Sequence, residues 1–159
     1  MGLKNSLQKF LLKRPFKKKT EKEKLLSARV SKIIGQNVKN LDYYHEAFSL
    51  KIPNKTTGAK NYERLEFLGD AVLGSIISCY LYKNYPDANE GFLTQMKSKI
   101  VNRKNLNSLG EKLKLTDFIQ NGGNGNLGEN ISGNLFEAFI GALYLDTNYE
   151  TCEKIVLVT

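Results

Sequence analysis

The chain has 159 residues, of which 41% are hydrophobic and 25% charged, with three prolines and no tryptophan. This composition excludes a disordered or fibrous protein, and the length allows one domain with a single sizeable core. The formal net charge of +8 is a possible sign of nucleic-acid binding, so where that charge lies along the chain matters.

The N-terminal residues 1–24 hold nine Lys or Arg against two Glu, whereas the rest of the chain carries a net charge of only +1. We predict a basic flexible tail over 1–24, which attracts phosphates without specificity, and one nearly neutral domain over 25–159. Residues 1–6 match a myristoylation pattern, and residues 1–19 contain no acid, as in a mitochondrial presequence. A solvated basic tail remains the favoured interpretation.

After the tail, apolar residues recur at helical spacing, and no stretch shows sustained strand alternation. Gly35 is a plausible C-terminal cap, and Pro86 stops the longest helix. Loops are expected over 51–60 and 121–128. The expected helices cover residues 25–34, 41–50, 61–84, 90–103, 106–113, 129–145, and 149 onward. We therefore predict an all-α fold.

The two cysteines, Cys79 and Cys152, fall in expected helices without CxxC spacing, so neither a disulfide framework nor a zinc site is expected. No apolar run approaches the ~18 to 20 residues of a membrane-spanning helix, and no signal peptide is recognisable. We expect a soluble, cytoplasmic protein that engages no membrane.

Three acidic residues share one face of an otherwise apolar helix over 61–84. At ~100° per residue, Glu63, Glu66 and Asp70 lie within roughly 60° of one another. Like charges at this spacing cost ~0.2 to 0.5 kcal/mol per pair, and burial adds to that penalty. Pairing with Arg64 or binding of a divalent cation would offset it, and Mg²⁺ prefers carboxylate and water ligands.

A second apolar helix carries Glu137, with Asn134 one turn earlier on the same face. A lone acid of this kind is usually a residue at the edge of the core with a satisfied partner. The spacing alone therefore leaves two interpretations open, a structural carboxylate or a metal site built from both helices.

The segment Glu63-Arg-Leu-Glu-Phe-Leu-Gly-Asp70 resembles the signature of the ribonuclease III family. Asn134-Leu-Phe-Glu-Ala-Phe-Ile-Gly-Ala-Leu-Tyr-Leu-Asp146 resembles the second acidic motif of that family, and residues 90–103 resemble the helix between the two motifs. The resemblance covers roughly residues 25–159.

This resemblance implies an all-helical endonuclease domain that dimerises to form a valley for an RNA duplex. Glu66, Asp70, Glu137 and Asn134 would form the site for Mg²⁺, or for Mn²⁺ in its place, with Asp70 and Glu137 as catalytic residues. Glu63 would support the site, and Phe67 would lie in the dimer interface. The implied reaction is cleavage of double-stranded RNA by a metal-activated water, as in ribosomal RNA maturation, with no small-molecule cofactor.

The sequence departs from the family pattern at several points. Asn134 stands where the second motif usually begins with Asp, which removes a negative charge from the site. Ser49-Leu-Lys51 replaces the usual Thr-His-Arg, and we interpret His45 as a surface or packing residue rather than a substitute for that histidine. We also expect a truncated C-terminal end without a double-stranded RNA-binding domain.

Three hypotheses follow. The first is an active endoribonuclease. The second is a catalytically weakened relative that acts as an RNA-binding or structural protein, favoured only by Asn134. The third is a basic helical protein whose tail binds RNA, which leaves the acidic stripe unexplained.

Overall fold

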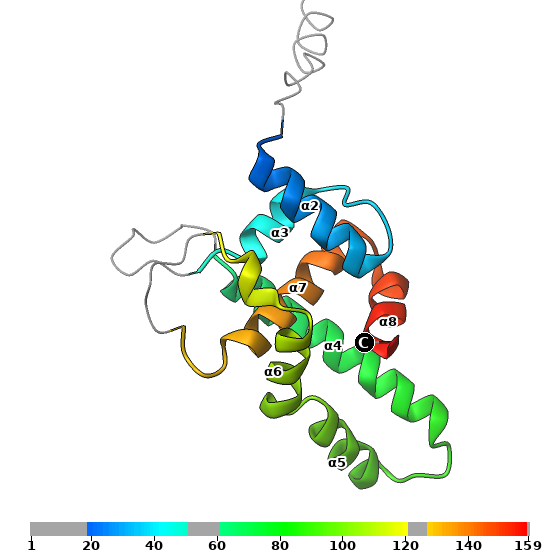
Figure 1. The fold of residues 1–159 in the computed structure, drawn as a ribbon. Coiled ribbons are helices and arrows are strands. Elements are labelled where there is room, and N and C mark those ends of the chain that lie inside the picture. The colour runs from blue at the N-terminus through cyan, green and yellow to red at the C-terminus, as the bar shows by residue number, and fades with distance from the viewer. Residues whose placement is uncertain (1–18, 51–60, 121–126, 159) are drawn as a thin grey trace, which may run out of the picture.

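The structure is a computed structural model that describes residues 19–50, 61–120 and 127–158. Within these ranges every regular element is helical, which confirms the all-α prediction (Figure 1). The elements are α2 (Glu21–Ile34), α3 (Leu41–Ala47), α4 (Glu63–Asn84), α5 (Glu90–Ile100), α6 (Arg103–Lys112), the 3₁₀ helix η1 (Leu115–Phe118), α7 (Ile131–Asp146) and α8 (Tyr149–Val158).

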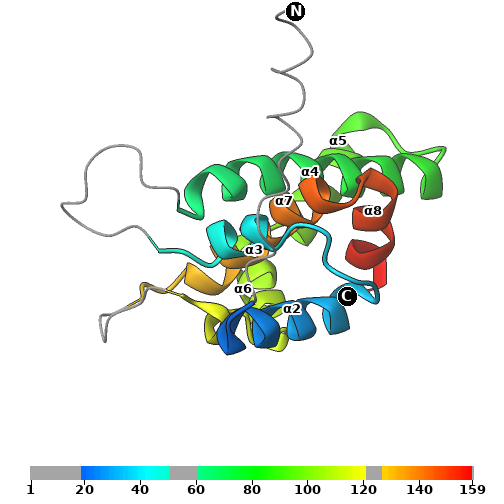
Figure 2. The same ribbon diagram turned by 90° about the horizontal axis from the view of Figure 1, so that it is seen from above.

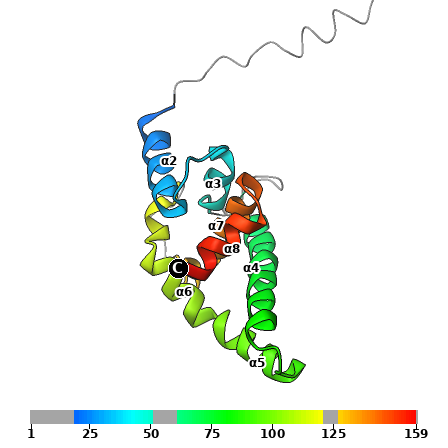
Figure 3. The same cartoon turned by 90° about the vertical axis from the view of Figure 1, so that its right-hand side faces the viewer.

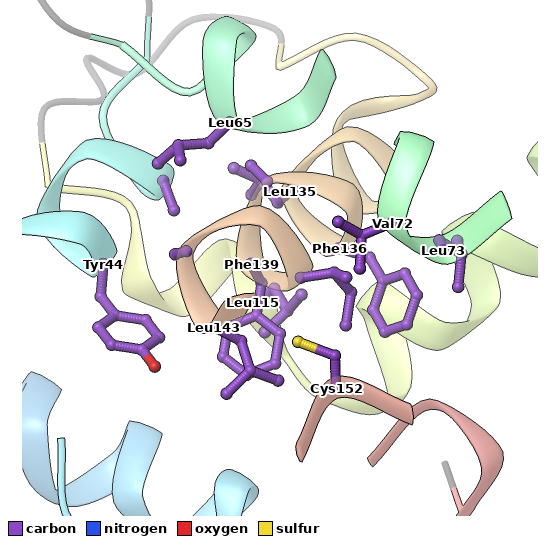
Figure 4. Close-up of a cluster of buried hydrophobic side chains, with 14 of the residues drawn as sticks. Tyr44, Leu65, Val72, Leu73, Leu115, Leu135, Phe136, Phe139, Leu143 and Cys152 are labelled. Atoms are coloured by element: carbon purple, nitrogen blue, oxygen red, sulfur yellow. The ribbon is translucent and has the colours of Figure 1, made fainter. Parts of the chain in front are cut away.

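Helix α7 is the centre of the domain and contacts α3, α4, α6, η1 and α8 (Figure 2). Twelve of its sixteen residues are buried, so it is a core helix rather than an amphipathic surface helix. In Figure 4 its side chains meet those of the surrounding helices. The labelled side chains there include Tyr44 from α3, Leu65, Val72 and Leu73 from α4, Leu115 from η1, Leu135, Phe136, Phe139 and Leu143 from α7, and Cys152 from α8.

Helices α4 and α7 pack against each other backbone to backbone, because a glycine lies on each side of the contact. A Cβ atom on Gly69 would overlap the carbonyl oxygen of Glu137, and one on Gly141 would overlap the carbonyl oxygen of Leu65. Only glycine permits this approach. The contact brings the acidic N-terminal half of α4 beside Glu137 of α7.

Helix α2 begins before the predicted domain boundary at residue 25. Thr20 and Glu23 form a capping box, in which each side chain accepts a hydrogen bond from the backbone N–H of the other residue. Residues 21–24, assigned to the tail by charge, are thus the first turn of α2. The helix ends at Gly35 in the left-handed conformation, with φ 69°, as its sequence predicts.

The other boundaries follow the predictions closely, with a few differences. The break between α5 and α6 lies at 101–102 instead of 104–105, because the Asn102 side chain caps α6 by accepting from the N–H of Asn105. The short helix η1 had no periodic signal in the sequence. The predicted loop over 51–60 and most of the one over 121–128 lie outside the described residues.

The carboxylate of Asp146 ties the end of α7 to the start of α3. It is buried and accepts hydrogen bonds from the backbone N–H of Lys39 (3.2 Å) and Asn40 (2.6 Å) and from the Tyr44 hydroxyl (3.2 Å). Burial, reinforced by this carboxylate, raises the pKa of Tyr44 far above its usual range. Asp146 is therefore a structural acid, with its lone pairs occupied inside the domain.

Helix α4 is long and apolar enough to cross a membrane by length and composition alone. Its contact with α7 and its row of carboxylates identify it as a core helix of the folded domain. Both cysteines are free thiols, and burial raises the pKa of Cys152 to about 11.

Candidate active site

The acidic stripe predicted on α4 lies at the N-terminal half of that helix, on the side next to α6 and α7. Glu63 is exposed and is tied to Asn61, whose side chain accepts from the Glu63 N–H at 2.9 Å and donates to its carboxylate at 3.3 Å. Glu66 is half-buried and Asp70 is exposed. The stripe therefore lies at the surface of the domain, and only its middle acid, Glu66, is partly covered.

Glu137 comes from α7, where it is only 4% exposed. Its backbone carbonyl is the group that lies against Gly69, so the glycine contact places this acid beside Glu66 and Asp70. The three carboxylates are close enough to influence one another electrostatically. The structure thus brings together the acids of two helices that are about 70 residues apart in the sequence.

Arg103, the first residue of α6, reaches into this site. Its Nη1 donates to the side-chain oxygen of Asn134 at 2.6 Å and lies 3.5 Å from Oε2 of Glu137. A cation at the first position of a helix opposes the helix dipole. The acidic site therefore accounts for the placement of this guanidinium.

The electrostatics of the site follow from burial and from this arginine. Burial raises the pKa of Glu137 to about 7, with Asp70 and Glu66 adding to the rise and Arg103 opposing it. Burial likewise raises the pKa of Glu66, again against the influence of Arg103 and with Glu63 and Asp70 adding to the rise. One arginine thus leaves the cluster short of positive charge.

The chemistry of this donor set suits a hard divalent cation. Three carboxylates and one amide offer only oxygen ligands, and two of the acids have raised pKa values that a second cation would lower. Among the described residues no three acidic, histidine or cysteine side chains converge closely enough to hold a metal ion in this conformation. Arg103 occupies the space between Asn134 and Glu137 instead.

Sequence reasoning missed Arg103 and considered Arg64 as the partner of the stripe. Arg64 lines a groove with Tyr43, Phe67 and Glu63, the acid at the start of the stripe. The signal that could have identified Arg103 is its place at a helix start, directly after the capping Asn102. His45 is half-buried, and its Nε2 is buried without a hydrogen-bond partner among the described residues. Nothing places it at the acidic site.

The segment that contains the candidate site matches a known protein family. The sequence profile of the ribonuclease III domain matches residues 63–148, which hold the acids of both helices and Arg103. This chain belongs to the ribonuclease III family. The resemblance inferred from the two motifs is confirmed.

Several relatives in the ribonuclease III family are similar over most of this chain. The protein named ribonuclease 3 from Zunongwangia profunda is 48% identical over 79% of the chain and 53% of its own length. The one from Flavobacterium psychrophilum is 44% identical over 87% of the chain and 58% of its own length. The chain thus spans little more than half the length of these relatives.

Among solved structures, the nuclease domain of ribonuclease III from Campylobacter jejuni has a TM-score of 0.72. It is 28% identical in sequence, and the match covers 82% of this chain and 92% of that domain. That structure is described in terms of flexibility in a region involved in dimer formation. The likeness supports the same domain architecture in this chain.

Proposed function

We propose that this chain is the catalytic part of an endoribonuclease that cleaves double-stranded RNA with Mg²⁺, or Mn²⁺ in its place. The observation that carries the proposal is the meeting of Glu66 and Asp70 from α4 with Glu137 from α7, within a ribonuclease III domain. A structural acid such as Asp146 has its lone pairs satisfied by backbone N–H groups. Glu137 instead faces other carboxylates and one arginine.

In this proposal Glu66, Asp70 and Glu137 hold the metal ion, and Asn134 supplies an amide oxygen beside it. Such an ion activates water for attack on a phosphodiester and stabilises charge on the phosphate oxygens. Arg103 and a bound metal ion would compete for the oxygens of Asn134 and Glu137, to which Arg103 now donates. A guanidinium released from them would be suited to pair with a phosphate. Glu63, which is exposed at the start of the stripe, would support the site.

The deciding experiment is a cleavage assay on a long RNA duplex with Mg²⁺, with Mn²⁺ and with chelator. We expect cleavage that requires metal and falls on the order of 10³-fold in Glu137→Gln. The Glu111→Gln variant makes the same change on an exposed part of α6 and is expected to keep full activity. An intact duplex in both metals would overturn the proposal.

We also propose that the protein acts as a homodimer through the surface around Phe67. This side chain is 79% exposed although it lies on the core helix α4. Beside it is a groove of about 630 Å³, whose apolar lining includes Leu65, Leu68 and Leu145. A large exposed aromatic next to an apolar groove suits a self-complementary interface between two copies.

The dimer is tested by sedimentation of Phe67→Ala. Loss of one buried phenylalanine costs about 1.5 to 3 kcal/mol, so the dimer dissociation constant should rise about 10- to 100-fold per ring. The thermal stability of the monomer should change little, because the side chain is exposed within one copy. The Tyr82→Ala variant, which removes another exposed aromatic from α4, serves as the control.

We propose that the natural substrate is a structured cellular RNA. Processing of RNA such as ribosomal RNA in the cytoplasm agrees with an enzyme that reads duplex shape rather than sequence. Asn134 favours a second candidate, a domain with weakened catalysis that binds RNA, because it lowers the negative charge of the metal site. Duplex binding without cleavage by the parent protein, in both metals, would favour that second candidate.

A further inference from the structure

The face of α4 that carries the acids continues beyond Asp70 to Gly74. Glu66, Asp70 and Gly74 are spaced four residues apart, so they follow one another along the same side of the helix. Each step advances about 6 Å along the axis, which is comparable with the separation of consecutive phosphates in a nucleic-acid strand. If one phosphate of a strand were bound at Asp70, a side chain lying over Gly74 would therefore face the next phosphate of that strand.

The side chain over Gly74 is Lys97 of α5. A Cβ atom built on Gly74 would lie 3.3 Å from the ammonium nitrogen Nζ and 3.5 Å from Cε. The absence of a side chain at Gly74 thus gives the lysine room to lie against α4. Lys97 is half-buried, and among the described residues its ammonium has no hydrogen bond or ion pair.

Lys97 and Arg103 are both cations near the stripe, but they act differently. Arg103 is bonded to Asn134 and lies near Glu137, and it lowers the pKa values of Glu66 and Glu137. Among the described residues no carboxylate forms an ion pair with the Lys97 ammonium, which is therefore available to an anion from outside the protein.

Lys97 lies in a groove of about 460 Å³ between α4 and α5. Ser75, Ser78 and Thr94 line the same groove. The Ser75 hydroxyl is hydrogen-bonded to the Tyr149 hydroxyl at 3.0 Å, and the Thr94 hydroxyl donates to the Glu90 carboxylate at 2.7 Å. Ser78 donates its proton to the Gly74 carbonyl at 2.7 Å, which leaves its oxygen as an acceptor toward the groove. An ammonium beside hydroxyl acceptors matches the phosphates and 2′-hydroxyls by which proteins recognise an RNA duplex.

We propose that Lys97 is a positioning residue that binds the phosphate next to the scissile phosphate. The scissile phosphate is the one that the proposed metal ion at Glu66, Asp70 and Glu137 would hold. The inference rests on the proposed function, because it takes a duplex RNA as the substrate of the same site. Lys97 touches no reacting atom. Its role is to fix the register of the strand along α4, which places the scissile phosphate over the carboxylates.

The test compares Lys97→Gln with Lys99→Gln on the full chain. Lys99 is two residues further along α5, about 200° around the helix, exposed, and outside the groove. For Lys97→Gln we expect KM for a long duplex to rise about tenfold with kcat within about twofold. The slope of log affinity against log salt should fall by about 1, measured on the non-cleaving Glu137→Gln background.

Lys99→Gln should leave KM, kcat and the salt slope near the parent values, and Lys97→Arg should recover most of the lost affinity because it restores the charge. Equal salt slopes and equal KM values for the two glutamine variants, with unchanged melting temperatures, would overturn the assignment. If the parent binds duplex RNA without cutting it, the proposed activity is wrong, while the salt slope still decides the role of Lys97.

Discussion

Helices α7 and α5 both pack against α4, but they do so in opposite ways. Helix α7 is buried over most of its length and meets α4 through Gly69 and Gly141. Helix α5 has no buried residue and lies at the end of the domain away from α2 (Figure 3). One face of α4 is therefore set by close backbone packing, and the adjoining face by side chains at the surface.

The two contacts supply different parts of the candidate site. The α4–α7 contact positions carboxylates, which must be held rigidly because their charges repel one another. The α5 helix and the start of α6 supply Lys97 and Arg103, whose long side chains can change partner without moving the backbone. The comparison indicates that the backbone holds the acids in fixed positions, whereas the side chains of Lys97 and Arg103 can change their partners.

The largest effect is expected where the rigid contact is broken. In Gly69→Ala the new methyl group would overlap the Glu137 carbonyl, and neither backbone can yield. We expect the free energy of unfolding to fall by more than about 4 kcal/mol, or the melting temperature by about 10 °C or more. Thermal denaturation measures this.

The matched change on the surface helix is Gly91→Ala in α5. The nearest atom to its new methyl group is the Asn89 side-chain oxygen at 3.6 Å, an ordinary contact. Stability should be unchanged or slightly higher, since alanine is the better helix former. Similar losses for the two variants would remove the distinction between the contacts.

A second, smaller effect concerns the charge buried at the rigid contact. The pKa of Glu137 is about 7 in the folded protein, above its ordinary value near 4.3 in the unfolded chain. Between these values the folded state binds more protons, so the metal-free protein loses stability as pH rises from about 5 to 8. The loss attributable to this group over that interval is about 2 to 3 kcal/mol, because its pKa lies about 2 units above pH 5 and one unit corresponds to about 1.4 kcal/mol.

Chemical denaturation in chelator at pH 5 and pH 8 measures this loss. Glu137→Gln should show a shallower decline than the parent, whereas Glu111→Gln on exposed α6 should decline as the parent does. Added Mg²⁺ should stabilise the parent at pH 8 and have less effect on Glu137→Gln. A parent protein that gains stability toward pH 8 in chelator would contradict the assignment.

The smallest predicted effect is at Asn134, the residue of α7 to which the adjustable Arg103 side chain donates. Asn134→Asp adds one negative charge beside Glu137, where Arg103 now donates to the amide oxygen. We expect Mg²⁺ to bind on the order of tenfold more tightly, as measured by calorimetry and by the metal dependence of cleavage. Asn148→Asp, at the start of α8, makes the same change elsewhere, and equal Mg²⁺ affinities for the two variants would refute this role of Asn134.

Sequence reasoning predicted the helices well because their signals are local. The Gly35 cap, the break at Pro86 and the apolar period of 61–84 depend on neighbouring residues only. The stripe of Glu63, Glu66 and Asp70 likewise follows from helix geometry once the helix is assigned. The start of α2 was missed because the charge of residues 21–24 was given more weight than the Thr20 capping signal.

The sequence by itself determined that this protein is all-helical, that three acids share one side of a core helix, and that both acidic motifs resemble those of the ribonuclease III family. Only the tertiary structure decided which groups face those acids. Arg103 is 34 residues from Glu137, and Lys97 is 23 residues from Gly74. Such pairs depend on how helices pack, and no local pattern of residues encodes that geometry.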